Sequence, residues 1–192
     1  MLEDQGRYLF TLLVIVFLGW FALGTQLNIR RGNAVLRWLQ DGLRLVGERT
    51  TLRWLGSSAV ELKVQDAAAP LRWAQVFVLL EPRDIPFLWW FFRARGRREL
   101  LIVRGQLHTM PRFELEALDG SAWSTRDIER DIRGRGWVRL EKLPGISLAA
   151  YANGGTKAAG EVLHDSLCAA GMPELHLVRL AVHQEAPNLE IQ

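Results

Sequence analysis

The amino-acid sequence predicts an α+β protein in which one N-terminal transmembrane helix precedes a single mixed, mostly antiparallel-sheet domain with three or four helices. Three observations support this class. A long uncharged apolar run lies near the N-terminus, several later segments alternate apolar with polar residues, and others show helical spacing with capping residues. The 192 residues suffice for one domain besides the anchor. We expect a short tail over residues 1–7, a transmembrane helix over 8–29 and an α+β domain over 30–192.

The predicted anchor contains no charged side chain between Tyr8 and Ile29. A bilayer core needs roughly 20 apolar helical residues, and this run meets that length. The alternative is a cleaved signal peptide, for which residues 22–24 (Ala-Leu-Gly) would supply the cleavage site. However, the run is longer than the roughly 7–15 residues of a signal core. The preceding segment also contains Glu3 and Asp4 instead of a basic cluster, which favours an uncleaved anchor.

Basic residues gather on the C-terminal side of this run. Arg7 precedes it, whereas five arginines follow it: Arg30, Arg31, Arg37, Arg44 and Arg49. The basic flank of a transmembrane helix stays in the cytoplasm. We therefore expect the N-terminus outside and the domain in the cytoplasm, with Arg30, Arg31 and Arg37 setting the topology. The single cysteine, Cys168, is compatible with a reducing compartment.

Beyond the anchor, Asn33 is the predicted N-cap of a helix over 34–49. This helix either packs on the sheet or lies along the membrane surface. Further helices are predicted to start at Ser124 and to run over 156–171. Alternating or apolar runs predict strands over 50–55, 59–65, 71–80, 99–107, 112–118, 137–143, 146–152, 174–182 and 188–192.

One segment combines aromatic and basic residues. Asp84 and Pro86 are predicted to open a helix, as N-cap and first-turn residue. The apolar run comprises Phe87, Leu88, Trp89, Trp90, Phe91 and Phe92, and the arginines that follow it are Arg93, Arg95, Arg97 and Arg98. A short helix that is apolar all round needs protein or lipid around it. We expect contact with the membrane or with a membrane-embedded partner. A core helix with a solvated basic loop and an RNA contact through the arginines are the alternatives.

The sequence contains no recognisable catalytic, cofactor-binding or metal site. It lacks a phosphate-binding glycine loop and a nucleophile elbow. His164 and Cys168 share a predicted helix face, but metal sites need three or four ligands, so we expect a free thiol. Glu114 and Glu116 alternate along a strand and are expected to form a solvated face. No cofactor or small-molecule substrate is expected.

The order of these features resembles the calumin family, a single-span, cytosol-facing subunit of the translocon-associated membrane-protein chaperone complex. The shared pattern includes residues 45–47 (Leu-Val-Gly) at a helix end, 83–85 (Arg-Asp-Ile) after an apolar strand, and the segment 143–149 (Leu-Pro-Gly-Ile-Ser-Leu-Ala). It covers roughly residues 8 to 182. The sequence departs from the family in lacking an acidic region before the span and a long basic coiled-coil tail. Calcium binding is therefore not carried over, and the case for ribosome contact is weakened.

The resemblance implies a non-enzymatic membrane protein that assists the insertion or folding of other membrane proteins. Membrane lipid and a membrane-protein partner, with the translocation machinery as one candidate, are the expected contacts. RNA or ribosome contact has weaker support. The alternatives are a scaffold subunit of another membrane complex and a membrane-tethered enzyme with an unrecognised site.

Overall fold

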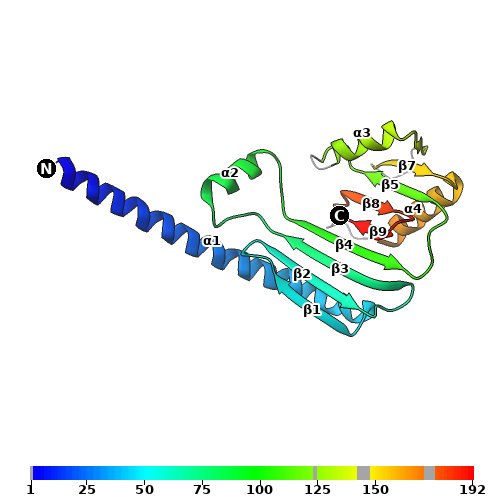
Figure 1. The fold of residues 1–192 in the computed structure, drawn as a ribbon, viewed down its shortest axis with the longest axis horizontal. Helices are drawn as coiled ribbons and strands as arrows, with labels where there is room; N and C mark the ends of the chain where they lie inside the picture. Colours follow the sequence, from blue (N-terminus) through cyan, green and yellow to red (C-terminus); the bar gives the residue numbers. More distant parts are fainter. Residues whose placement is uncertain (1, 123–124, 142–147, 171–175) are drawn as a thin grey trace. The chain divides into compact units, whose positions relative to one another are not determined.

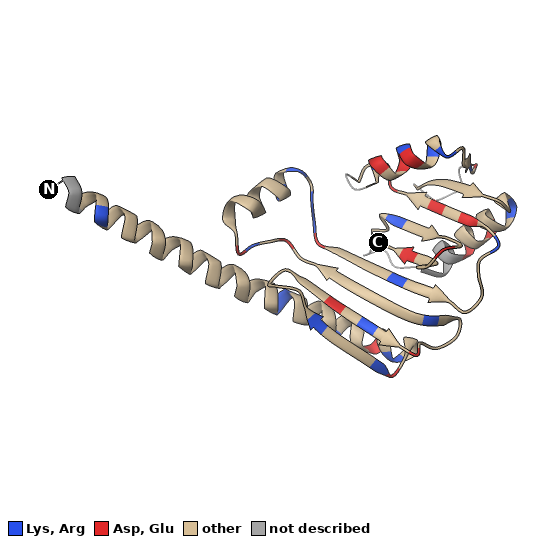
Figure 2. Ribbon diagram, in the orientation of Figure 1, with Lys and Arg blue, Asp and Glu red and all other residues tan. Residues whose placement is uncertain are grey.

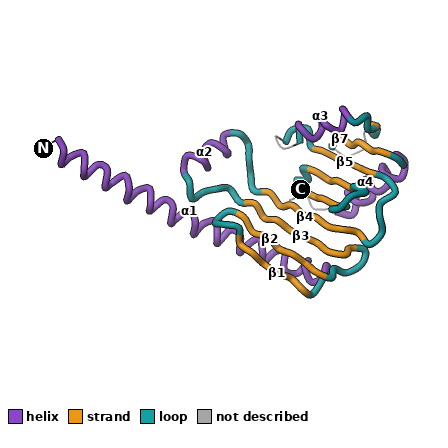
Figure 3. Tube along the Cα trace, in the orientation of Figure 1, coloured by secondary structure: helices purple, strands orange, loops and turns teal. Residues whose placement is uncertain are grey.

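The computed structural model describes residues 2–122, 125–141, 148–170 and 176–192, and it confirms the α+β class. The described residues form four helices and one antiparallel nine-stranded sheet, whose strand order is β1-β2-β3-β4-β9-β8-β5-β7-β6 (Figures 1 and 3). The elements in chain order are α1 (Leu2–Val46), β1 (Arg49–Trp54), β2 (Ala59–Gln65), β3 (Leu71–Leu79), α2 (Pro86–Ala94), β4 (Leu100–Leu107), β5 (Glu114–Leu118), α3 (Arg126–Gly134), β6 (Val138–Arg139), β7 (Ala149–Asn153), α4 (Thr156–Ala170), β8 (Arg179–Val182) and β9 (Leu189–Ile191).

The chain divides into two compact units. The first comprises Met1–Leu43, Leu52–Glu61 and Phe77–Leu100, and the second comprises Arg44–Thr51, Leu62–Val76 and Leu101–Gln192. The first unit therefore contains most of α1 and all of α2. The second contains the strands and helices that follow β4.

Helix α1 is continuous from Leu2 to Val46. The prediction of a new helix capped by Asn33 was wrong, because α1 continues through this residue. Glycine in a helix interior costs only about 1 kcal/mol relative to alanine, which is too little to end a long helix. Gly32 also has a packing role, because a Cβ there would lie 2.6 Å from Cη2 of Trp54. This glycine admits an indole ring and does not break the helix.

The two halves of α1 have different surroundings. Residues 5–23 are all exposed, whereas Gly24, Asn28 and Gly32 are buried at four-residue intervals along one side of the helix. Apart from Arg7, the exposed half shows no charge (Figure 2). By length and composition, α1 is able to cross a membrane.

The start of α2 agrees only in part with the sequence. Pro86 occupies the first turn as predicted, but the N-cap residue is Ile85, and no side chain caps the helix. The prediction of Asp84 as N-cap was wrong. Its Oδ2 instead accepts a hydrogen bond at 2.6 Å from the hydroxyl of Ser57, which lies between β1 and β2.

In the second unit, β5 lies between β7 and β8 and pairs antiparallel with both, for example through Leu115 with Ala152 and Val182. One face of these strands packs on α4 through Leu163. On the other face, Leu118 and Tyr151 pack against Ile132 of α3. Strands β5 and β7 are therefore covered by a helix on each face, α4 on one and α3 on the other.

The segment between β4 and β5 is a crossover, because β9 pairs with β4 and β8 pairs with β5. The predicted cap Ser124, the helix end at Gly171 and parts of the strands predicted over 137–143, 146–152 and 174–182 lie outside the described residues.

Candidate functional site

The aromatic helix α2 has two distinct faces. The structure describes all of α2, and none of its residues is buried, which contradicts the core-helix alternative. Phe87, Trp90 and Phe91 are 68%, 70% and 42% exposed. Their i, i+3, i+4 spacing places them on one side of the helix. Leu88, Trp89 and Phe92 are half-buried on the other side. The aromatic run therefore supplies one anchoring face and one outward apolar face.

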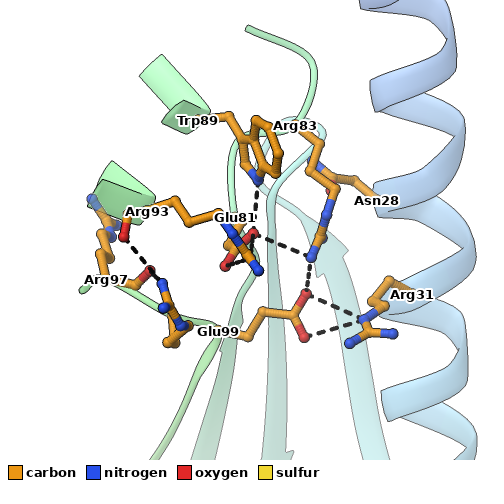
Figure 4. Close-up of polar contacts among 9 residues, drawn as sticks. Asn28, Arg31, Glu81, Arg83, Trp89, Arg93, Arg97 and Glu99 are labelled. Carbon is orange, nitrogen blue, oxygen red and sulfur yellow. Dashed lines mark hydrogen bonds and ion pairs between the residues drawn. The ribbon is translucent and has the colours of Figure 1, made fainter. Parts of the chain in front are cut away.

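The anchoring face binds the buried carboxylate of Glu81. This residue, only 5% exposed, follows β3. Its Oε2 accepts a hydrogen bond from the Trp89 indole at 2.8 Å, and its Oε1 forms an ion pair with Arg93 at 3.1 Å (Figure 4). The Arg93 guanidinium also lies 5.6 Å from the centre of the Trp89 ring. One carboxylate thus fixes two successive turns of α2.

Arg83 extends this cluster to α1. Its guanidinium forms an ion pair with Glu99 at 2.8 Å and donates a hydrogen bond to Oδ1 of Asn28 at 3.2 Å. It also lies 3.4 Å from Glu81. Glu99 accepts a hydrogen bond from Arg31 of α1 at 3.3 Å, so charge pairs run from α2 to α1 (Figure 4). We call these residues, Glu81, Arg83, Trp89, Arg93, Glu99, Asn28 and Arg31, the junction cluster.

The backbone of Arg83 also lies directly against α1. The Trp20 indole donates a hydrogen bond to the Arg83 carbonyl at 2.9 Å. One turn further along α1, a Cβ on Gly24 would overlap that same carbonyl and would lie 2.5 Å from the Cα of Asp84. Only glycine permits this approach. The segment that leads into α2 is therefore seated in a notch between Trp20 and Gly24.

The arginines after the aromatic run have several contacts within the first unit. Arg95 stacks over Phe91 at 4.0 Å and Arg97 over Phe92 at 4.5 Å, both measured to the ring centres. Arg98 donates to the backbone carbonyls of Arg93 and Arg97, each at 3.2 Å. Such stacking keeps the guanidinium charge close to the aromatic surface.

The three predicted topology-setting arginines, Arg30, Arg31 and Arg37, are all exposed on α1. Arg31 is the member that joins the junction cluster, through Glu99.

A second charged cluster lies on the sheet in the other unit. Glu116 is 2% exposed, so the prediction that it belongs to a solvated strand face was wrong. Its carboxylate accepts hydrogen bonds from Arg179 at 2.5 and 2.9 Å and contacts Nε2 of His183 at 2.9 Å. Arg179 also pairs with Glu190 at 2.8 Å, and Glu190 pairs with Arg104 at 2.6 Å. We call these residues the sheet cluster.

Burial raises the pKa of Glu116, but the hydrogen bonds and positive charges of Arg179 and His183 outweigh it and hold that pKa below its ordinary value. Burial by itself lowers the pKa of Arg179. The hydrogen bonds to Glu116 and the negative charges of Glu116 and Glu190 outweigh burial, so the pKa of Arg179 is raised. Both groups are therefore stabilised in their charged forms, as a structural ion pair requires.

Sequence reasoning missed the junction cluster except for its α2 members and Arg31. Asn28 is a polar residue inside the apolar run, and Glu81 ends an otherwise apolar strand. Both were visible as interruptions of a pattern. Their pairing through Arg83 was not visible, because it joins residues that are 55 positions apart.

Metal binding has no support among the described side chains, in which no group of three or more His, Cys, Asp or Glu residues could hold an ion. The side chain of Cys168 lies outside the described ones, so its expected free thiol stays a prediction. The two carboxylates of the junction cluster, Glu81 and Glu99, are each shared by two of its three arginines. Their geometry suits positioning of α2.

Comparison with models of known protein families gave no match, and comparison with curated proteins gave no similar sequence.

Proposed function

We propose that this chain is a non-enzymatic, single-pass membrane protein that acts through contacts with other membrane proteins and assists their insertion or folding. The observation that carries the proposal is the abrupt change in α1 at Gly24. Residues 8–23 are uncharged and exposed on every side of the helix, whereas from Gly24 onward the helix packs along one side.

The length of the exposed half matches a bilayer. Residues 5–23 at 1.5 Å per residue extend roughly 28 Å, close to the about 30 Å of a hydrocarbon core. Leu9, Phe10 and Leu18, for example, are 61%, 69% and 59% exposed. A helix with apolar residues on every side needs lipid or protein around it. A bilayer supplies that surrounding along this whole half.

The arginine distribution supports an N-out, C-in orientation. Arg30, Arg31 and Arg37 follow the uncharged run that begins at Tyr8, and Arg7 alone precedes it. The remainder of the chain would then lie in the cytoplasm.

A positioning role for the charged residues supports action by contact. Each carboxylate of the junction cluster is bound by arginine, and these pairs hold the aromatic helix beside the anchor. The assignment to insertion or folding comes from the resemblance to the calumin family. A scaffold role in another complex and a membrane-tethered enzyme are the competing functions.

Protease protection and crosslinking together test the proposal. Externally added protease should leave the sheet domain intact in spheroplasts and digest it only after lysis. A photoreactive residue at Ile15, which is 61% exposed, should crosslink to integral membrane proteins, with Val138 (56% exposed) as the control position. Capture of translocation components supports the assisting role, whereas capture of one unrelated complex favours the scaffold. Digestion from outside, or release of the chain by alkaline extraction, refutes the proposal.

A further inference from the structure

We infer that α2 lies in the headgroup layer of the bilayer that α1 crosses, with Phe87, Trp90 and Phe91 directed toward the acyl chains. The inference rests on the proposed function only in requiring that α1 spans the membrane. It assigns a lipid-binding surface to α2, a helix outside the membrane-spanning segment. The occupant of this surface is the anionic leaflet on the side of Arg30 and Arg31.

The depth of α2 follows from the notch on α1. Arg83 contacts Trp20 and Gly24, where the exposed half of the helix ends. Pro86, the first residue of α2, follows Arg83 by three positions, a separation of at most about 11 Å. If residues 5–23 fill the hydrocarbon core, the start of α2 lies at its boundary. In Figure 4, Trp89 lies near the level of Asn28 of α1, and Glu99 lies near the level of Arg31, one turn further along that helix.

The outward face of α2 has the chemistry of an interfacial helix. Phe87 and Trp90 are the most exposed aromatic residues of α2, and Ala94 continues the same face one turn later. Tryptophan and phenylalanine favour the boundary between headgroups and acyl chains, and interfacial helices sink about 5–10 Å into it. Phe87 and Trp90 leave this face apolar and largely exposed, and Arg95 stacks on Phe91 at its edge.

The charge that follows α2 complements an anionic leaflet. Arg95 and Arg98, which follow α2, are exposed. Figure 2 shows basic residues in blue along the segment after α2. Basic side chains beside the membrane attract anionic headgroups. Because Arg95 stacks on Phe91, its charge lies next to the face that inserts.

The junction cluster keeps this face directed outward. Trp89 and Arg93 on the opposite side of α2 are both bound to the buried carboxylate of Glu81. Rotation of α2 about its own axis would break both contacts. The helix is therefore held with its aromatic face away from the first unit before it meets lipid.

Spin-label depth measurements on the full chain test this inference. In a Cys168→Ala background, a nitroxide is attached to a cysteine introduced as Trp90→Cys or as Ala94→Cys. The second variant keeps every aromatic residue of α2. Ile15→Cys serves as the reference within the anchor, and Val138→Cys as the exposed control in the sheet. The chain is reconstituted in vesicles of equal parts phosphatidylcholine and phosphatidylglycerol. Collision with oxygen, which concentrates in lipid, is compared with collision with a water-soluble nickel chelate.

We expect the labels at positions 90 and 94 to collide more often with oxygen and less often with the nickel chelate than the label at position 138. Their depth in the bilayer should be shallower than that of the label at position 15. Labels at 90 and 94 that match position 138 while position 15 lies in lipid would overturn the inference alone. A water-exposed label at position 15 would overturn the proposed function as well. Labels shielded from both reagents in native membranes, but water-exposed in the vesicles, would assign the face to a protein partner and refute lipid docking.

Discussion

The junction cluster and the sheet cluster each centre on a buried glutamate, but they join different kinds of structure. Glu81, 5% exposed, binds residues that belong to α2 and to the segment seated on α1. Glu116, 2% exposed, binds residues of neighbouring strands or of the turn that follows them, Arg179 of β8 and His183. The sheet cluster reinforces contacts that the backbone ladder already makes. The junction cluster holds two helices that no backbone ladder joins.

The difference indicates where each cluster acts. Loss of a cross-strand ion pair lowers the stability of the sheet, whereas loss of the junction releases a helix whose outward face is apolar. Unfolding measurements on the full chain in detergent test this division, and local hydrogen exchange locates the effect of each glutamate variant.

The largest effect is expected for Glu116→Gln. Removal of one partner from a buried pair leaves an uncompensated charge and costs about 3–5 kcal/mol. We expect about 3 kcal/mol in the free energy of unfolding, because Glu190 still pairs with Arg179. Hydrogen exchange should rise in β5 and β8 and stay unchanged in α2. The control is Asp127→Asn, whose pair with Arg130 is exposed, with an expected change of less than about 1 kcal/mol. Equal effects of the two variants would contradict the structural role of Glu116.

A smaller effect, about 2 kcal/mol, is expected for Glu81→Gln, since hydrogen bonds to charged groups contribute about 1.5–3 kcal/mol each and Arg83 retains Glu99. Here exchange should rise over residues 83–94 and remain unchanged in β5. If exchange rises equally in both regions, the two clusters are not independent, and the comparison fails.

Gly24→Ala tests the notch on α1. The added Cβ would overlap the Arg83 carbonyl, and overpacking of this kind costs about 1–3 kcal/mol. We expect a value near the lower end, about 1 kcal/mol, because the loop can shift. Gly19→Ala is the matched control, since its Cβ would meet nothing within 4 Å. The fluorescence of Trp20 should change in the first variant only, and equal changes would place the loop elsewhere.

Acid should weaken the sheet cluster gradually. The pKa of Glu116 in the folded protein is lowered from 4.5, so the carboxylate stabilises the fold above its unfolded pKa. This contribution is lost as the pH falls through the lower, folded pKa. The stability difference between wild type and Glu116→Gln should therefore shrink below about pH 4.5. A difference that stays constant down to the acid limit of folding would show that the charge of Glu116 contributes nothing.

The sequence by itself determined the features that depend on local pattern. Apolar content over the first helix, period-two alternation in β2 and β5, and Pro86 in the first turn of α2 each act within a few residues. Sequence also identified the aromatic and basic residues of α2, though not which of them point outward.

Only the tertiary structure decided the features that depend on contacts between distant residues. Asn33 reads as the start of a new helix until its neighbour Gly32 is found packed against Trp54, and Asp84 reads as a cap until Ser57 binds it. Glu116 has the alternation of a solvated face, but Arg179, 63 positions away, makes its burial favourable. Hydrophobic period reports which side of an element is apolar. It cannot report which buried polar group meets a partner of opposite charge, because that depends on how the chain returns to the same place.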